Sequence, residues 1–204
     1  MTTNDVVKGV RAGDHPIAQL FLDRWSPRAF RPEAISEREL LTMLEAARWA
    51  PSSSNLQPWR FVFARRNTDA WPTLLDLLVR DNRDWAQHAS ALVFFVSYAL
   101  MPSRESGRLI PSPTHSFDTG TAAGYFALQA HLLGWYTHGM YGFDHDRAVQ
   151  VLRVPPHHRL EAVYAVGRIG ERALLPEALR AREVPSQRHS LAALSYEAFM
   201  AAKQ

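Results

Sequence analysis

Residues 91–98 read Ala-Leu-Val-Phe-Phe-Val-Ser-Tyr and contain five bulky apolar side chains in succession, Leu92 to Val96. Aromatic and β-branched residues favour strands. A strand that is covered on only one face alternates apolar with polar residues, and this stretch does not alternate. It therefore predicts a strand that is buried on both faces and lies at the centre of a sheet.

Weaker patterns on both sides of this strand predict the elements that cover it. Ser36 and Glu39 match a capping box, and a helical apolar pattern follows them until Pro51. The other expected elements are helices over 16–22, 71–79, 118–134 and 147–152 and strands over 61–64 and 161–170. Because helices and strands alternate irregularly, the sequence indicates an α+β fold with a central sheet covered by helices, in a single domain over residues 1–204. We expect residues 1–14 to be flexible.

The predicted helix over 118–134 is built mainly from small and apolar residues, including Gly120, Ala123, Gly124 and Ala127. Small residues four positions apart allow another backbone to approach closely. Two interpretations stay open, because a helix that is apolar all round is simply buried. It is either a core helix of a monomer or a helix shared between the core and a subunit interface.

The charge of the chain is modest. A count of 23 basic against 20 acidic residues gives a net charge of +3, and only Lys8 and Lys203 are lysines. These charges are scattered rather than gathered in a block, so they are weak evidence for a nucleic acid partner. They agree at least as well with a small anionic ligand, since a few clustered arginines suffice to hold one phosphate.

Several classes of protein are excluded or disfavoured by what the sequence lacks. With no cysteine, disulfides, cysteine-ligated zinc, iron–sulfur clusters and a thiol nucleophile are excluded. No P-loop, GxGxxG or HExxH motif occurs, so we expect no metal site. Residues 1–13 lack the apolar core of a secretory signal, and no apolar run reaches the roughly 18 residues of a membrane span. We therefore expect a soluble cytoplasmic protein that binds neither membrane nor nucleic acid.

Two polar segments stand out against this background. Arg24-Trp25-Ser26-Pro27-Arg28 places two guanidinium groups and a hydroxyl around a proline that cannot lie inside a helix. Arginine binds phosphate through charge-assisted hydrogen bonds in a fixed fork. The second segment, Ala50–Trp59, is a polar, turn-forming run that ends in Gln-Pro-Trp. Together the two segments are typical of a site for a ligand with an anionic group and a ring.

Taken with later motifs, these segments resemble the FMN-dependent nitroreductase family. The resemblance rests on Arg24-x-Ser26-x-Arg28-x-Phe30, Ala47-x-x-Ala50-Pro51-Ser52-Ser53-x-Asn55-x-Gln57-Pro58-Trp59-x-Phe61, Asn82-x-x-Trp85-Ala86, Asp118-Thr119-Gly120, His138-Gly139-Met140-x-Gly142-Phe143-Asp144 and Arg188. It implies a mixed, mostly antiparallel sheet flanked by helices, and a homodimer with FMN at the subunit interface. It also implies electron transfer from NADH or NADPH to a nitroaromatic, quinone or similar planar acceptor by a ping-pong mechanism.

The resemblance further implies how the site is divided. Arg24, Ser26 and Arg28 would hold the phosphate, and Arg188 would close that site from another side. The loop 51–57 would line the ring of the flavin held mainly by the other subunit. The main chain of residues 137–140, expected as a glycine-containing turn, would meet the reactive part of the flavin. The full expected set of cofactor-binding residues is Arg24, Trp25, Ser26, Arg28, Pro51, Ser52, Ser53, Asn55, Gln57, Asn82, His138, Gly139, Met140 and Arg188. The flavin carries the chemistry, so no catalytic side chain is expected.

The sequence also departs from the family. His189 stands where the family commonly has lysine, so the phosphate would depend on Arg188 alone on this side. The position of Gly139 often carries a larger residue. The proline-rich stretch 101–115, which includes Arg104 and His115, is expected to be a loop or lid. It could adapt the enzyme to a reaction of reduced flavin with oxygen or a specialised substrate, and a non-catalytic flavin- or nucleic-acid-binding module is the remaining alternative.

Overall fold

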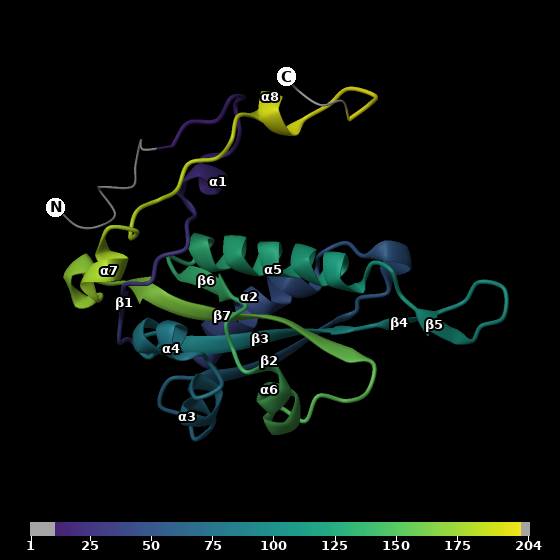
Figure 1. The fold of residues 1–204 in the computed structure, drawn as a ribbon, viewed down its shortest axis with the longest axis horizontal. Coiled ribbons are helices and arrows are strands. Elements are labelled where there is room, and N and C mark those ends of the chain that lie inside the picture. The colour runs from purple at the N-terminus through teal and green to yellow at the C-terminus, as the bar shows by residue number, and fades with distance from the viewer. Residues whose placement is uncertain (1–10, 201–204) are drawn as a thin grey trace.

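The computed structural model describes residues 11–200, and these form a central sheet with helices around it (Figure 1). The helices are α1 (Gln19–Asp23), α2 (Glu37–Arg48), α3 (Ala70–Leu75), α4 (Arg80–Ala86), α5 (His115–Leu132), α6 (His145–Val151), α7 (Glu177–Arg180) and α8 (Leu191–Leu194), with 3-10 turns η1 (Ser53–Asn55) and η2 (Arg172–Leu174). The strands are β1 (Phe30–Arg31), β2 (Trp59–Arg65), β3 (Ala91–Tyr98), β4 (Leu100–Pro102), β5 (Leu109–Pro111), β6 (Tyr136–Met140) and β7 (His158–Ile169). The expected α+β class is confirmed.

Strand β3 lies where its apolar sequence predicts. It pairs with β2 on one side and with β7 on the other, and β7 pairs in addition with β1 and β6. Each of these described pairings is antiparallel. Since both neighbours of β3 are long strands, its backbone groups are satisfied on both edges and its side chains can be buried on both faces.

Successive side chains of β3 enter two separate apolar clusters. Phe94 packs with residues of α3, α4 and α6 on one face of the sheet. Val93 and Phe95 pack with residues of α2 and α5 on the other face. Figure 1 shows this arrangement, with α5 on one side of the sheet and α3 and α6 on the opposite side. The period-2 geometry of a strand thus divides one continuous apolar run between two cores.

The start of α2 is fixed by the predicted capping box. The Ser36 hydroxyl accepts from the Glu39 N–H at 3.2 Å, and Glu39 Oε2 accepts from the Ser36 N–H at 3.2 Å. The other carboxylate oxygen of Glu39 accepts a hydrogen bond from the Trp135 indole at 3.0 Å. One side chain therefore caps α2 and also ties it to the segment between α5 and β6.

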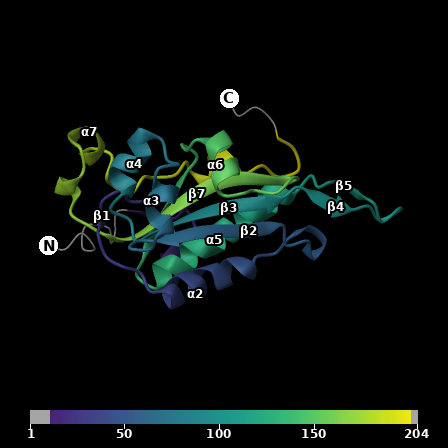
Figure 2. The ribbon, with the colours of Figure 1, turned by 90° about the horizontal axis from the view of Figure 1, so that it is seen from below.

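One expected turn is a strand, and the expected loop over 101–115 is a loop that contains two short strands. Residues 137–140, expected as a turn, belong to β6, which pairs with β7 from Tyr136 opposite Gly167 to Met140 opposite Val163. Pairing with an already formed sheet outweighs the poor strand propensity of a glycine. The expected loop or lid over 101–115 contains the β4–β5 hairpin, which projects from one end of the sheet (Figure 2), and His115 already belongs to α5.

The helix expected over 71–79 is wrong in its second half. Helix α3 ends at Leu75, Leu78 forms a bridge with Phe143, and Val79 N–H donates to the Gly142 carbonyl at 3.2 Å. These contacts with the segment that follows β6 hold residues 78 and 79 extended, and α4 begins only at Arg80. Local helical spacing could not reveal this partner because it lies more than 60 residues away.

The apolar residues Leu191, Leu194, Tyr196 and Phe199 near the chain end predict a segment that needs a surface to lie on. Within the described chain they remain exposed, with Leu194 61% and Phe199 83% accessible. Figure 1 shows α8 and α1 on the α5 side of the sheet, standing away from the sheet. Among residues 11–200, no helix combines the length and the apolar content that a bilayer crossing requires.

Candidate anion-binding site

A cavity of about 330 Å³ brings five arginines together from distant parts of the chain. The turn between α1 and β1, strand β6, the segment after α7 and the first described residues all contribute to its wall. The lining residues are Arg11, Arg24, Trp25, Ser26, Arg28, His138, Arg182, Val184, Ser186 and Arg188. Six of the fourteen residues expected at the cofactor site therefore meet in one place.

The five guanidinium groups make this cavity strongly positive. Within residues 11–200, none of the five arginines forms a salt bridge. Burial lowers the pKa of Arg24, and the nearby Arg188 guanidinium lowers it further. Burial and then the charge of Arg182 lower the pKa of Arg28 in the same way. Like charges held at close range in a partly buried site repel, so a bound anion would stabilise this arrangement.

Residues 24–28, which we call the arginine turn, are anchored at three points. Trp25 is 4% exposed and packs edge-to-face on Tyr136 with ring centroids 6.5 Å apart. The Pro27 carbonyl lies 3.0 Å from His138 Nδ1. The backbone N–H groups of Arg28 and the residue after it both donate to Glu183 Oε1 at 2.8 Å. With its backbone held by the core, the turn can present its arginines to the cavity.

The neighbouring part of β6 exposes backbone where a ligand could approach. In the described chain β6 pairs only with β7, so one set of its backbone N–H and C=O groups faces away from the sheet. Gly139 is exposed, and a Cβ at this position would lie 2.9 Å from the ring of Tyr164. The side chain of Met140 is instead buried in the core. Glycine thus leaves the strand surface open where a larger residue would contact that ring.

His138 is kept neutral at the edge of the cavity. Burial lowers its pKa to about 4, and the positive charge of Arg28 contributes to this shift. Because the Pro27 carbonyl can only accept, the proton of the neutral ring lies on Nδ1. His138 therefore holds the arginine turn without adding to the positive charge at neutral pH.

The structure places the loop 51–57 elsewhere. The Ser53 N–H donates to Asp118 Oδ2 at 3.2 Å, in the first turn of α5, whereas the arginine cavity adjoins β6, which follows the last turn. Helix α5 has 18 residues and spans about 27 Å at 1.5 Å per residue. One chain therefore does not bring Pro51, Ser52, Ser53, Asn55 and Gln57 together with its own arginines.

The loop 51–57 is nevertheless a constrained structure. Ser54, Asn55 and Gln57 all have positive φ, at 49°, 54° and 48°. Such backbone angles are unfavourable for residues other than glycine and cluster at functional sites. The Ser52 hydroxyl accepts from the Gln57 N–H at 2.9 Å, which closes the loop on itself. The exposed side chains of Asn55 and Gln57 are thus presented by a shaped, solvent-facing loop.

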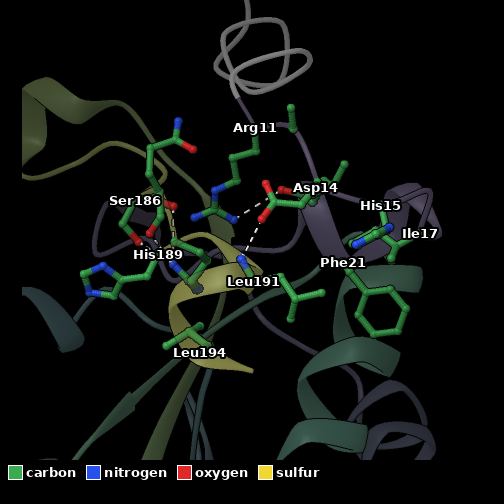
Figure 3. Close-up of a pocket in the computed structure, with 14 residues that line it drawn as sticks. Arg11, Asp14, His15, Ile17, Phe21, Ser186, His189, Leu191 and Leu194 are labelled. Carbon is green, nitrogen blue, oxygen red and sulfur yellow. Dashed lines mark hydrogen bonds between the residues drawn. The ribbon is translucent and has the colours of Figure 1, made fainter. Parts of the chain in front are cut away.

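The expected residue Asn82 lies outside the arginine cavity, and so does His189. Asn82 on α4 donates from Nδ2 to the Gly142 carbonyl at 3.0 Å, where it holds the segment that follows β6. His189 lines a second cavity of about 310 Å³ between the first described residues and α8. Figure 3 shows this cavity, in which Asp14 accepts a hydrogen bond from the Leu191 N–H at 2.6 Å. Arg11 and Arg188 line both cavities.

His115, which was expected in the lid, joins a polar cluster at the start of α5. Ser97 Oγ lies 2.7 Å from His115 Nδ1 and donates to Glu161 Oε1 at 2.5 Å. Ser97 is fully buried, so its hydroxyl cannot reach a substrate. The cluster instead ties α5 to β3 and β7. Nowhere in residues 11–200 do three His, Asp or Glu side chains gather closely enough to hold a metal ion.

Sequence reasoning missed three residues of the site. Arg11 and Arg182 line the cavity, and Glu183 binds the arginine turn. Residues 172–182 looked like an ordinary solvated charged segment, and nothing in their spacing pointed to a ligand. The available signal was weak: a glutamate next to an arginine, shortly before the family-like Arg188.

The fold and this cavity define an α+β protein with an arginine-lined cavity beside an edge strand, and comparisons with known proteins identify its family. The model of the Nitroreductase family matches residues 22–83, which include both the arginine turn and the loop 51–57. A solved oxidoreductase that contains FMN is 46% identical, with a TM-score of 0.90, and the match covers 95% of this chain and 97% of that one. The chain belongs to the nitroreductase family.

More distant relatives agree with this assignment. A protein of Thermus thermophilus named NADH dehydrogenase is 26% identical over 174 residues, which cover 72% of this chain and 83% of that protein. A putative nitroreductase from Desulfovibrio desulfuricans, solved in complex with FMN, is 24% identical with a TM-score of 0.68, and the match covers 92% of this chain and 99% of that one. At that level of identity the second comparison shows the shared fold.

The neutral state of His138 leads to a pH prediction. Its pKa falls from an ordinary 6.5 to about 4 in the folded protein, so between these values the unfolded chain binds more protons. The stability that depends on neutral His138 is complete above pH 6.5 and is lost as the pH falls towards 4. We expect His138→Gln, whose amide can still donate to Pro27, to reduce this loss.

The measurement is the free energy of unfolding in urea at pH 7.5 and pH 4.5, at one protein concentration. His15→Gln is the matched control, because His15 is exposed and its substitution should leave the pH dependence unchanged. Equal loss of stability in wild type and His138→Gln would contradict the prediction.

Proposed function

We propose that this protein is an FMN-dependent oxidoreductase that passes electrons from NADH or NADPH to a nitroaromatic, quinone or similar planar acceptor. The observation that carries the proposal is the cavity of five arginines, which form no salt bridge in the described part of the chain, beside the exposed backbone of β6. It is supported by the 46% identity to an oxidoreductase that contains FMN, over nearly the whole chain.

The arginine cavity fits the phosphate of FMN. A phosphate monoester is close to a dianion at neutral pH, and two or three charge-assisted donors suit it. The guanidinium groups of Arg24, Arg28 and Arg182 make no hydrogen bond or salt bridge within residues 11–200, so they would be available to a ligand. Ser26 adds a hydroxyl at the same wall. Burial and then repulsion from neighbouring guanidinium groups lower the pKa of Arg24 and of Arg28, and a bound phosphate would relieve the repulsion.

The exposed strand β6 suits the other end of such a ligand. When bound, FMN supplies hydride and electron transfer between the nicotinamide and the acceptor. The protein's part is to bind and orient it, and main-chain N–H groups near Gly139 could stabilise negative charge on a reduced ring. No acid, base or nucleophile of the chain is required for this chemistry.

We further propose that the site is completed in a homodimer. The exposed face of α5 carries large apolar side chains at Phe117, Tyr125 and Leu132, which are 77%, 42% and 64% accessible. Between them, Gly120 and Gly124 are exposed, and a Cβ added at either would meet nothing within 4 Å. An apolar helix face with two glycines four residues apart suits the close approach of a second helix.

This dimer would bring together two half-sites, loop 51–57 and the arginine cavity, that lie apart within one chain. Loop 51–57 is bonded to the start of α5 and the arginine cavity adjoins the strand that follows its end. If two copies pack through α5 in opposite directions, the loop of one copy lies near the cavity of the other. The side chains of Asn55 and Gln57, which offer amide donors and acceptors, would then meet the ring edge of a flavin held by the other copy. The cytoplasmic location expected from the sequence stays a prediction.

The first test is an absorbance spectrum of the purified protein, with FMN added if it is colourless. We expect bound flavin that is bleached by NADH or NADPH without oxygen and recoloured by a quinone or nitroaromatic. Initial rates at several fixed acceptor concentrations should give parallel double-reciprocal lines, as a ping-pong mechanism requires. Failure to take up FMN would overturn the proposed function, and intersecting lines would overturn the mechanism alone.

Replacing one phosphate ligand should weaken FMN binding. Loss of a charged hydrogen-bonding group costs about 1.5–3 kcal/mol, so Arg28→Ala should raise the dissociation constant of FMN about 10- to 100-fold. Riboflavin, which lacks the phosphate, should bind the variant and the wild type equally. Arg80→Ala is the control, because Arg80 has a side chain 85% exposed on α4. Equal effects on FMN and riboflavin would place Arg28 away from the phosphate.

The dimer can be tested by a substitution that should stabilise α5 in a single chain but weaken a dimer formed through α5. Gly124→Leu should favour the isolated helix by about 0.8–1 kcal/mol, because leucine is a better helix former than glycine. At an α5 interface the same leucine would keep the partner helix apart. We therefore expect a shift towards monomer in sedimentation velocity, together with loss of FMN. Arg38→Leu, on the exposed side of α2, should change neither, and a Gly124→Leu dimer that retains FMN would refute the shared site.

A further inference from the structure

Glu183 is a buried carboxylate at the edge of the arginine cavity. It follows Arg182 in the segment after α7, and its residue is only 7% exposed. Its Oε1 accepts from the backbone N–H groups of Arg28 and Ala29, both at 2.8 Å. Its Oε2 has no hydrogen-bond partner in residues 11–200. The two bonded segments are separated by about 155 residues, so this contact is a purely tertiary one.

The direction in which Glu183 points is unusual for a carboxylate among arginines. A buried carboxylate is costly unless it is paired, and a salt bridge with a guanidinium would be the simplest pairing. Glu183 forms no salt bridge within the described chain and bonds two backbone N–H groups instead. The guanidinium groups are thereby left to the cavity, whereas a Glu–Arg pair would compete with an anionic ligand for the same arginine.

The contact also joins the two walls of the cavity. Arg24 and Arg28 lie on the segment whose backbone N–H groups donate to Glu183. Arg182 and Arg188 lie on the segment that contains Glu183. Without the contact of Glu183 with the backbone of Arg28 and Ala29, repulsion between the Arg28 and Arg182 side chains would favour separation of these two walls. The carboxylate offsets part of this repulsion, since it raises the pKa of Arg28 against the effects of burial and of Arg182.

We propose that Glu183 is a positioning residue for a phosphate monoester: it clamps the backbone of the arginine turn to the segment that carries Arg182 and Arg188, so that arginines from both ends of the chain face one cavity. The inference rests on the proposed function, in which the ligand is FMN. It adds that selection of FMN over riboflavin depends on a residue that does not itself touch the phosphate.

Three roles for Glu183 predict different results. A positioning role needs an acceptor oxygen on a long side chain, so Glu183→Gln should retain most of the function and Glu183→Ala should lose it. A role as a counter-charge predicts that both variants bind FMN more tightly, because each removes one negative charge from a site for an anion. A general structural role predicts that FMN and riboflavin lose affinity by the same factor.

The experiment is a fluorescence titration of FMN and of riboflavin against the full-length wild type, Glu183→Ala and Glu183→Gln. We expect Glu183→Ala to weaken FMN binding about tenfold or more, with riboflavin changed less than about twofold, and Glu183→Gln to recover most of the loss. Glu177→Ala, which removes an exposed carboxylate from α7 of the same region, should match the wild type. Unchanged FMN affinity in Glu183→Ala, tighter binding in both variants, or equal losses for both flavins would overturn the proposal.

A further variant keeps the proposal testable if Glu183→Ala does not fold. Glu183→Asp retains the charge but shortens the side chain by one methylene, so it cannot reach both N–H groups without moving the backbone, and it should weaken FMN binding selectively. An FMN affinity equal to that of the wild type would overturn the clamp. If the wild type binds neither flavin, the proposed function fails on its own, and titration of the same variants with inorganic phosphate by calorimetry decides the role of Glu183 separately.

Discussion

The site depends on one electrostatic constraint, the gathering of five guanidinium groups that form no salt bridge with any carboxylate of residues 11–200. The guanidinium groups repel one another, and burial removes part of the water that would stabilise their charges. The protein tolerates the repulsion because the backbone of the arginine turn is fixed by a buried tryptophan, a neutral histidine and the Glu183 carboxylate. Repulsion that the fold holds in place would favour a bound anion in this cavity.

The sheet supplies the rigidity that this constraint requires. Strand β3 is buried on both faces, and β7 beside it also carries β1 and β6. The arginine turn leads directly into β1, and His138 lies on β6, so these two parts of the cavity lining are attached to strands of one sheet. At the same time α5 separates this cavity from loop 51–57 by its own length. A flavin site that uses both the cavity and loop 51–57 would therefore need two copies of the chain. Their contact face would be the apolar and glycine-containing side of α5.

Sequence reasoning succeeded where a local interaction decides the structure. The capping box at Ser36 and Glu39 works within a few residues, and the apolar run of β3 reports its own burial. It failed where a distant partner decides. Residues 137–140 looked like a turn because they contain a glycine, yet pairing with β7 makes them a strand. The stretch 101–115 differs from these residues, because it is mostly loop, as its prolines predict, and its two short strands pair locally with each other.

The sequence by itself determined the α+β class, the buried central strand and the family-like order of the arginine turn, loop 51–57 and Arg188. Each of these follows from composition, periodicity or a short motif. Only the tertiary structure decided which of these residues share a cavity. It separated loop 51–57 from the arginines, placed Asn82 on a backbone carbonyl, and added Arg11, Arg182 and Glu183. The physical reason is that a cavity is formed by contacts between segments about 155 residues apart, and neither charge nor spacing along the chain records which segments will meet.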